Sequence, residues 1–201
     1  AASDVYKRQV LYKVYYFGKD YILMSKFVLI DGHSILNRAF YGVPIFTNSE
    51  GLHTNAVFGF LNIMFKIIDS KQPDYMAVAF DVHQPTFRHE MFKDYKGTRK
   101  PMMEELREQV PVIKELLQKM NITTVELPGY EADDVIGTLS KEGEKAGMEV
   151  DVISGDRDLL QLASDHITIC IPKTKKGQTT VEEYNTEGVR KLYKVTPTEF
   201  I

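Results

Sequence analysis

The sequence has 201 residues, of which 43% are hydrophobic, and a formal net charge of -3 at pH 7. A chain of this length and composition can bury one core, so we expect one domain or most of one. The net charge neither supports nor excludes a nucleic-acid partner, because it sums an acidic cluster and local basic stretches. The single cysteine, Cys170, excludes a disulfide framework within the chain and fits an intracellular, reducing compartment.

The first 23 residues differ from the rest of the chain. Their apolar, aromatic stretch, Val10–Phe17, is interrupted by Lys13 and followed by charged residues. It is too short and too charged to span a bilayer, and it lacks the apolar region and cleavage site of a signal peptide. Met24 is a plausible start, so we expect residues 1–23 to be a non-native leader outside the fold.

The folded part is expected to begin with a short β-rich run, Lys26–Asp31. Ser34 is the expected cap of a helix over residues 35–41. Within that helix Arg38 lies about two turns beyond the strand end, near enough for its guanidinium to reach a phosphate there. The alternative is a solvated helix arginine.

A loop over residues 42–55 leads to a long helix that ends near Asp69. Apolar residues lie nearly all round this helix, a pattern typical of the protein interior. We therefore assign its aromatic residues to packing and not to base stacking. Pro73 separates the helix from a second strand, Tyr75–Asp81.

The least globular stretch runs from residue 83 to residue 101 and is called the basic segment below. Its window 93–100 holds four basic residues against Asp94, a local net charge of +3, with aromatic residues interleaved. This composition suits phosphate contact and stacking on an unpaired base, although a solvated linker is the alternative. Its position after Asp81 favours nucleic-acid binding. The residues expected to contact nucleic acid are Arg38, Arg88, Lys93, Tyr95, Lys96, Arg99 and Lys100.

The remaining elements alternate between strands and helices, the pattern of an α/β fold with a mostly parallel sheet. Pro111 lies inside one of the helices and predicts a kink or a break there. The expected strands are at 122–127, 150–154, 167–171 and 179–182, and the expected helices are at 102–120, from the GYEADD stretch to 145, from 156 to 162 and at 184–193.

Acidic residues recur where the predicted strands end. Because the carboxyl ends of parallel strands share one edge of a sheet, we expect these carboxylates to gather there. Oxygen ligands without a cysteine cluster favour Mg²⁺ or Mn²⁺ over zinc or copper. The seven acids expected to bind cations or act in catalysis are Asp31, Asp81, Glu131, Asp133, Asp134, Asp156 and Asp158.

Other interpretations of these acids stay open. The EADD stretch also suits the first turn of a helix, where the macrodipole favours negative charge. Asp156 can instead cap a short helix. His33 and His83 follow strand-end aspartates by two residues, so a mixed histidine and carboxylate iron site is a further alternative. The sequence has no G-x-G-x-x-G or Walker motif for nucleotide phosphates.

Four ordered stretches carry a specific resemblance. FVLIDGHSILNRAFYG, VAFDVHQPTFRHEMFKDYKGTRKP, LPGYEADDVIGTL and VISGDRDLLQL resemble the 5′ nuclease (5′-3′ exonuclease) domain at the amino terminus of bacterial DNA polymerase I. That domain belongs to the flap endonuclease and PIN-like superfamily. The resemblance covers residues 26–201, essentially the whole chain after the expected leader.

The resemblance implies a three-layer α/β fold, with a mostly parallel central sheet, helices on both faces and a basic helical arch. It implies a nuclease with two Mg²⁺ (or Mn²⁺) ions that removes 5′ flaps and RNA primers at duplex junctions in replication and repair. By likeness, the acids matching Asp31, Asp81, Glu131 and Asp133 hold the first ion, with Asp134 and Asp156 nearby and Asp158 towards the second. Arg38, Tyr95, Lys96 and Arg99 match the arch and phosphate-steering residues.

The resemblance also implies a monomer in the bacterial cytoplasm, associated with the nucleoid, with a polymerase domain in cis and no membrane contact. Family members continue with two further aspartates and a helix-hairpin-helix, which are not found before Ile201. We therefore expect residues 24–201 to be a nuclease domain truncated at its carboxyl end, and the activity of the isolated chain is open. The alternatives are a PIN-type ribonuclease and a catalytically incomplete DNA-junction binding module.

Overall fold

The computed structural model describes residues 25–82, 84–98, 101–175 and 178–200. The expected leader, 1–23, lies outside the described residues, as do His83, Arg99 and Lys100. Within the described part of the chain, no helix is long and apolar enough to cross a membrane.

Six strands of the described chain form one sheet in the order β3-β2-β1-β4-β5-β6. The strands from β3 to β5 in this order are parallel to one another, and β6 pairs antiparallel with β5. The strands in the middle of the sheet are apolar runs because helices cover both of their faces. The strands are β1 (Lys26–Asp31), β2 (Tyr75–Ala79), β3 (Thr123–Val125), β4 (Glu149–Ile153), β5 (Ile167–Lys175) and β6 (Gln178–Tyr184).

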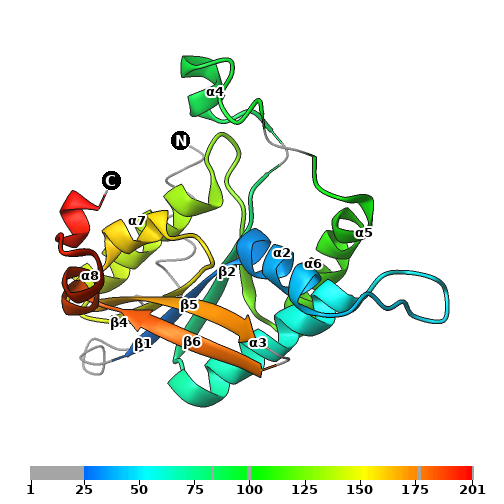
Figure 1. The fold of residues 1–201 in the computed structure, drawn as a ribbon, viewed down its shortest axis with the longest axis horizontal. Helices are drawn as coiled ribbons and strands as arrows, with labels where there is room; N and C mark the ends of the chain where they lie inside the picture. Colours follow the sequence, from blue (N-terminus) through cyan, green and yellow to red (C-terminus); the bar gives the residue numbers. More distant parts are fainter. Residues whose placement is uncertain (1–24, 83, 99–100, 176–177, 201) are drawn as a thin grey trace.

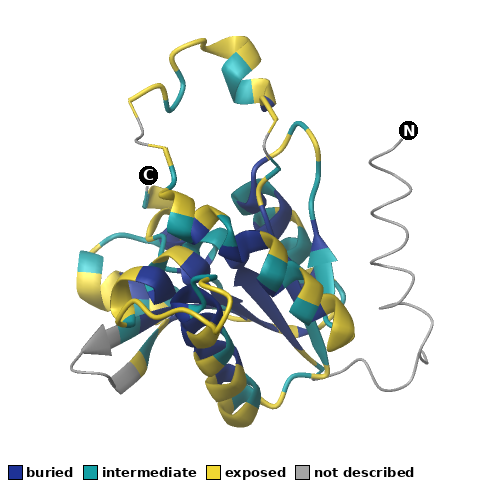
Figure 2. Ribbon diagram, turned by 90° about the vertical axis from the view of Figure 1, so that its right-hand side faces the viewer, coloured by how far each residue is buried: buried dark blue, intermediate teal, exposed yellow. Residues whose placement is uncertain are grey.

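Helices cover the two faces of the sheet and enclose two apolar cores, which confirms the expected three-layer α/β fold (Figure 1). Buried residues concentrate on the strands and on the inward sides of these helices (Figure 2). One face carries α2 (Gly32–Gly42), α3 (Asn55–Lys71) and α6 (Gln109–Lys119), and the other carries α7 (Ala132–Lys145) and α8 (Thr186–Tyr193).

The order of the strands creates a switch point between β1 and β4. From β1 the chain builds outward through β2 to β3, and it then returns to add β4 on the other side of β1. Connections that leave neighbouring strands in opposite directions open a crevice at the carboxyl ends of those strands. Asp31 ends β1 and Ser154 follows β4, so both lie at this crevice.

The helix after β1 begins earlier than the sequence suggested. We expected Ser34 to cap a helix starting at residue 35, whereas α2 starts at Gly32 and Asp31 is its cap. The Asp31 carboxylate accepts a hydrogen bond from the Ser34 N–H at 3.0 Å. An acidic cap satisfies an unpaired N–H of the first turn, and the strand therefore passes directly into the helix.

The expectation that α3 is buried all round is wrong. Phe58 is 52% exposed and Phe65 is 45% exposed, whereas Phe60 is fully buried. Phe58 and Phe65 are seven residues apart, so they share the side of the helix that faces away from the sheet. The Phe58 ring packs edge-on against Phe46 in the preceding loop, with a centroid distance of 5.8 Å.

The expected break near Pro111 is confirmed. The predicted helix at 102–120 divides at Glu108 into α5 (Glu104–Arg107) and α6, and Pro111 lies in the first turn of α6, where its missing N–H costs no helical bond. Strand β2 ends at Ala79, two residues before the predicted end, so Asp81 lies in the following loop.

The described part of the basic segment stands away from the body of the domain. It contains the short helix α4 (Phe87–Met91), which projects beyond the sheet and its covering helices (Figure 1). Two 3₁₀ turns complete the described elements, η1 (Asp158–Leu162) and η2 (Pro197–Glu199).

Candidate metal and nucleic-acid site

A cleft of about 650 Å³ opens at the carboxyl edge of the sheet. It lies at the switch point between β1 and β4, where ligands of α/β sheets bind. Five of the seven acids singled out in the sequence line it, and their metal-binding role stays a prediction. These five are Asp31, Asp81, Glu131, Asp133 and Asp156.

Asp31 is the most deeply buried of these acids, at 5% exposure. Burial raises the pKa of Asp31 to about 6, against two hydrogen bonds that lower it, and the charges of Asp81 and Asp156 raise it further. One of the hydrogen bonds comes from the Ser154 hydroxyl, which donates to the Asp31 carboxylate at 2.8 Å. Asp31 is therefore held in place by the loop after β4.

Asp81 joins the loop after β2 to the start of α7. Its carboxylate accepts the Ala132 N–H at 2.7 Å, which is an otherwise unpaired donor at the helix start. The Asp81 N–H donates to His33 Nδ1 at 3.1 Å. The side chain of Asp81 is half exposed and faces the cleft.

Asp133 lies in the first turn of α7, and its pKa reflects burial and the charges of the neighbouring carboxylates. Burial raises the pKa of Asp133 to about 7, and the charges of Asp31, Asp156 and Asp81 raise it further, while Lys96 opposes the shift. Carboxylates grouped against their mutual repulsion are typical of a site that binds a cation.

The donor atoms of the cleft fit a hard divalent cation such as Mg²⁺ or Mn²⁺, because they are carboxylate oxygens without a thiolate. In the orientations that the described side chains adopt, no three acidic, histidine or cysteine residues are grouped so that they could hold a metal ion. Asp31 is engaged by Ser154, Asp81 by Ala132 and Glu131 by Lys96. Each of these carboxylates has lone pairs beyond those that the hydrogen bonds use, so these contacts leave oxygen sites for an ion.

The basic segment bends back onto the cleft through Tyr95 and Lys96. Lys96 Nζ donates to Glu131 Oε1 at 2.7 Å, and the Tyr95 hydroxyl donates to Glu131 Oε2 at 3.1 Å. Lys96 has a positive φ of 57°, which turns the chain towards the acids. Two residues expected to contact nucleic acid therefore contact one of the expected metal ligands.

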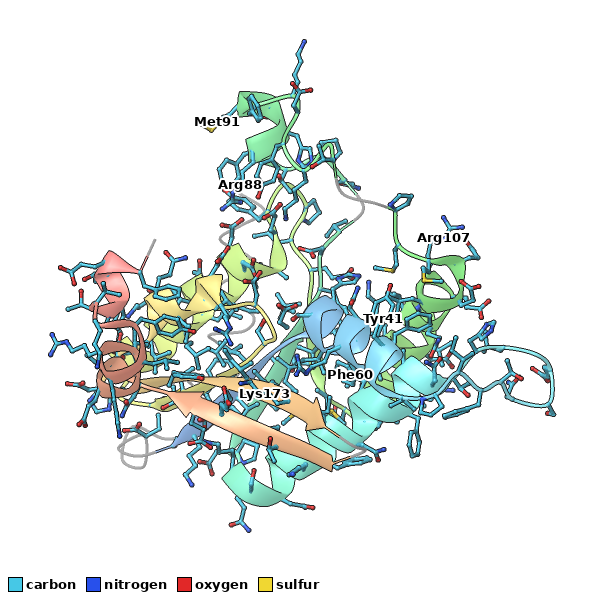
Figure 3. All side chains as sticks on the ribbon, in the orientation of Figure 1. Tyr41, Phe60, Arg88, Met91, Arg107 and Lys173 are labelled. Carbon is cyan, nitrogen blue, oxygen red and sulfur yellow. The ribbon has the colours of Figure 1, made fainter. Side chains whose placement is uncertain are left out.

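Arg88 and Asp134, which the sequence placed in different roles, form a pair. Both terminal nitrogens of Arg88 donate to the Asp134 carboxylate, at 2.7 and 2.8 Å. The Arg88 guanidinium holds the pKa of Asp134 below its usual range. The Arg88 side chain extends from α4 towards the body of the domain (Figure 3). Asp134 is thus turned towards Arg88 and does not line the cleft of Asp31.

Asp158 also lies apart from the five acids. It lines a neighbouring cleft of about 540 Å³ together with Arg88 and Asp134, and Glu131 and Asp133 border both clefts. The Asp158 N–H donates to the Asp156 carboxylate at 2.9 Å, so the backbone of Asp158 contacts the side chain of Asp156.

Arg38 offers an unused donor beside the acidic cleft. It lines a hollow of about 420 Å³ with Asn37 and Gly155, and Asn37 also lines the cleft of Asp31. Arg38 Nε is buried without a hydrogen-bond partner. Burial lowers the pKa of Arg38. Lys93, by contrast, is exposed in the turn that follows α4.

Ser34 and Ser154 form hydrogen bonds that connect the segments after β1 and β4 at the switch point, and this role was not predicted from the sequence. Ser154 Oγ donates to Asp31 and accepts the Asp156 N–H at 3.0 Å. Ser34 Oγ accepts the Gly155 N–H at 2.9 Å. Both serines follow a strand within three residues, a position that marks a polar group at the carboxyl edge of a sheet. We had assigned Ser34 only to capping.

Comparison with protein families and curated sequences identifies the family of the chain. Residues 26–194 match the family model of the 5′-3′ exonuclease, N-terminal resolvase-like domain. The chain is 50% identical over 179 residues to DNA polymerase I of Bacillus caldotenax and 51% identical over 177 residues to that of Bacillus subtilis (strain 168). The alignments cover 89% and 88% of this chain but 20% of each relative, so the chain spans about a fifth of their length.

Solved structures with low sequence identity share the fold. The bacteriophage T5 flap endonuclease, in a pseudo-enzyme-product complex with DNA and metal ions, has a TM-score of 0.66 at 22% identity over 87% of this chain and 63% of that chain. The T5 5′-exonuclease with bound zinc has a TM-score of 0.64 at 20% identity over 87% of this chain and 64% of that chain. On the family match and the sequence identity, the chain belongs to the family of 5′-3′ exonuclease N-terminal, resolvase-like domains that includes the nuclease domain of bacterial DNA polymerase I.

Proposed function

We propose that this domain is a divalent-metal-dependent 5′ nuclease that hydrolyses phosphodiester bonds in DNA. Its substrates would be 5′ flaps and RNA primers at duplex junctions. The observation that carries the proposal is the juxtaposition of five carboxylates in one cleft with a basic segment that folds over them. Carboxylates alone would repel DNA, and the cations of the basic segment offset that repulsion.

Two Mg²⁺ or Mn²⁺ ions would occupy the site. The five acids of the larger cleft would hold the first, and Asp158 in the neighbouring cleft would contribute to the second. When bound, such ions activate a water molecule and neutralise the charge that develops on the phosphoryl and leaving oxygens.

The protein side chains would orient the DNA around that chemistry. Arg38 has a buried donor without a protein partner, so a phosphate oxygen would satisfy it. Lys96 is bound to a carboxylate and can exchange it for a phosphate, because both are anionic oxygen acceptors. Tyr95 lies beside Lys96 and offers a ring on which an unpaired base can stack. Asp31 is fixed by Ser154, which orients its carboxylate towards the cleft.

The wider setting of this activity follows the curated relatives. DNA polymerase I of two Bacillus species contains a matching region, so a polymerase domain in cis and a role in replication and repair are part of the proposal. A monomer in the bacterial cytoplasm, near the nucleoid, fits this setting.

The decisive experiment measures Mg²⁺-dependent cleavage of a 5′-flap DNA by the protein at its full natural length. The Asp81→Ala variant should abolish cleavage while flap binding survives, because Asp81 lines the acidic cleft. The control is Asp165→Ala, an exposed acid just before β5, at the opposite edge of the sheet. Unchanged turnover of Asp81→Ala would remove Asp81 from the mechanism.

The same assay separates the alternatives. Preferential cleavage of single-stranded RNA would favour a PIN-type ribonuclease. Tight binding of the flap with no turnover in Mg²⁺ or Mn²⁺ would favour a DNA-junction binding module.

A further inference from the structure

Helix α4 is tied to the loop that precedes α7 by a small set of contacts. The Phe87 N–H donates to the Gly129 carbonyl at 3.1 Å, and the Phe87 ring lies 5.7 Å from that of Tyr130 between centroids. Arg88 adds its two hydrogen bonds to Asp134. Met91, near the far end of the helix, is 82% exposed and points away from the domain (Figure 3). The attachment of α4 is therefore concentrated at its first two residues.

Both oxygens of the Asp134 carboxylate accept hydrogen bonds from within the protein. One carboxylate oxygen accepts from Arg88 alone, and the other accepts both from Arg88 and from the Glu131 N–H at 3.0 Å. A planar guanidinium that donates two parallel hydrogen bonds forms a strong, charge-assisted pair with a carboxylate. The same contact turns the terminal nitrogens of the Arg88 guanidinium towards Asp134.

The pair also reaches the acidic cleft through Glu131. The bond between the Glu131 N–H and Asp134 forms half of a capping box at the start of α7, which fixes the backbone of Glu131. The Glu131 carboxylate also accepts hydrogen bonds from Lys96 and Tyr95, which follow α4 in the sequence. The Asp134 carboxylate therefore contacts both the start of α4, through Arg88, and the backbone of Glu131. Glu131 is in turn the residue that Lys96 and Tyr95 of the basic segment contact.

We propose that Arg88 and Asp134 are positioning residues that form a clasp, holding α4 and Glu131 in a fixed relation so that Lys96 and Tyr95 stay over the acidic cleft. In this role neither residue contacts the cation or the scissile phosphate. The proposal rests on the proposed nuclease function for its effect on turnover, but the clasp itself can be tested without turnover.

A double-mutant cycle tests the clasp. Arg88→Lys keeps the positive charge and loses the planar fork, and Asp134→Asn keeps an acceptor for the Glu131 N–H and loses one acceptor for Arg88. Each change should lower kcat on a 5′ flap by about tenfold, and the double variant should lower it by the same factor, because both changes break one contact. KM should change by less than about twofold, since neither Arg88 nor Asp134 itself contacts the substrate in this proposal.

Amide hydrogen exchange in the DNA-free protein provides the independent readout. Two amides of α4 report on the clasp: the Phe87 N–H, and the Phe92 N–H, which donates to the Arg88 carbonyl at 2.8 Å. Both should exchange faster in each single variant than in the wild type. The double variant should show the same exchange rates as the single variants. The matched control is Glu115→Gln, which removes the exposed Lys119–Glu115 pair of α6 and should leave both readouts unchanged.

Distinct results would overturn the proposal. Weaker flap binding in Arg88→Lys with a normal Asp134→Asn would make Arg88 a phosphate contact. Weaker Mg²⁺ binding in Asp134→Asn with a normal Arg88→Lys would make Asp134 a metal ligand. Additive losses, or faster exchange with an unchanged kcat, would remove the positioning role. If the wild-type protein cleaves no substrate, the nuclease proposal fails while the exchange data still decide whether the clasp exists.

Discussion

The two flanks of the basic segment are fixed to the domain in different ways. On the α4 side the contacts are ionic and partly exposed, between Arg88 and Asp134 and between Lys96 and Glu131. On the α6 side the contacts are neutral and buried, between the amides of Gln109 and Asn55. Both join segments that are far apart in the sequence, but only the first joins them with charged groups that solvent and salt can reach.

On the α6 side, both polar atoms of the Gln109 side chain have hydrogen-bond partners. Gln109 is 0% exposed, and its carbonyl oxygen accepts the N–H groups of Ala56 and Val57 at 2.8 and 3.2 Å. Its amide nitrogen donates to Asn55 and to the Glu105 carbonyl. A side chain of α6 thereby satisfies the unpaired donors at the start of α3. The contrast teaches that the α6 flank belongs to the rigid scaffold and the α4 flank to the functional surface.

The largest expected effect on stability comes from removing the Gln109 side chain, which makes the buried hydrogen bonds on the α6 side. Gln109→Ala leaves two buried N–H groups and the side-chain oxygen of Asn55 without the partner that Gln109 supplies, so it should lower the free energy of unfolding by about 3 kcal/mol. Urea denaturation measures this change. The matched control is Gln118→Ala, an exposed glutamine of the same helix, which should change it by less than about 0.5 kcal/mol. Equal losses in the two variants would show that the network is not part of the scaffold.

A smaller effect of opposite sign is expected in the acidic cleft. Without divalent ions at pH 8, Asp133→Asn should raise the free energy of unfolding by about 1 kcal/mol, because it removes a partly buried carboxylate that Asp31, Asp156 and Asp81 repel. Mg²⁺ should stabilise the wild-type protein by about 1.4 kcal/mol at ten times its dissociation constant, and stabilise the variant less. Thermal unfolding with EDTA and with Mg²⁺ measures both. A variant that is less stable than the wild type in EDTA would contradict the repulsion argument.

The sequence was sufficient for the architecture because the architecture depends on local patterns. Apolar runs gave the strands of the sheet, and Pro111 gave the break between α5 and α6. Strand-end acids at a shared sheet edge gave the cleft that Asp31 and Asp81 line. Each of these rests on the spacing of residues within a short stretch.

What the sequence could not give are pairings set by the tertiary structure. Arg88 and Asp134 are 46 positions apart, and each alone suits a role in binding DNA or metal. The exposure of Phe58 was missed because an apolar residue gives no sign of which side of a helix the sheet covers. Gln109 was assigned no role, since an isolated glutamine in a helix is ordinarily solvated.

The smallest expected effect separates the two flanks by their response to salt. Raising NaCl from about 0.05 to 0.5 M shortens the screening length from about 14 to 4 Å, which weakens exposed ion pairs more than buried neutral hydrogen bonds. The Phe87 and Phe92 amides of the α4 flank should therefore exchange about twofold to threefold faster at high salt. The Ala56 and Val57 amides, which donate to buried Gln109, should be unchanged. If the amides of both flanks respond equally, the α4 flank is held by packing of Phe87 on Tyr130 and its hydrogen bond to Gly129, and the ionic contacts add nothing to its attachment.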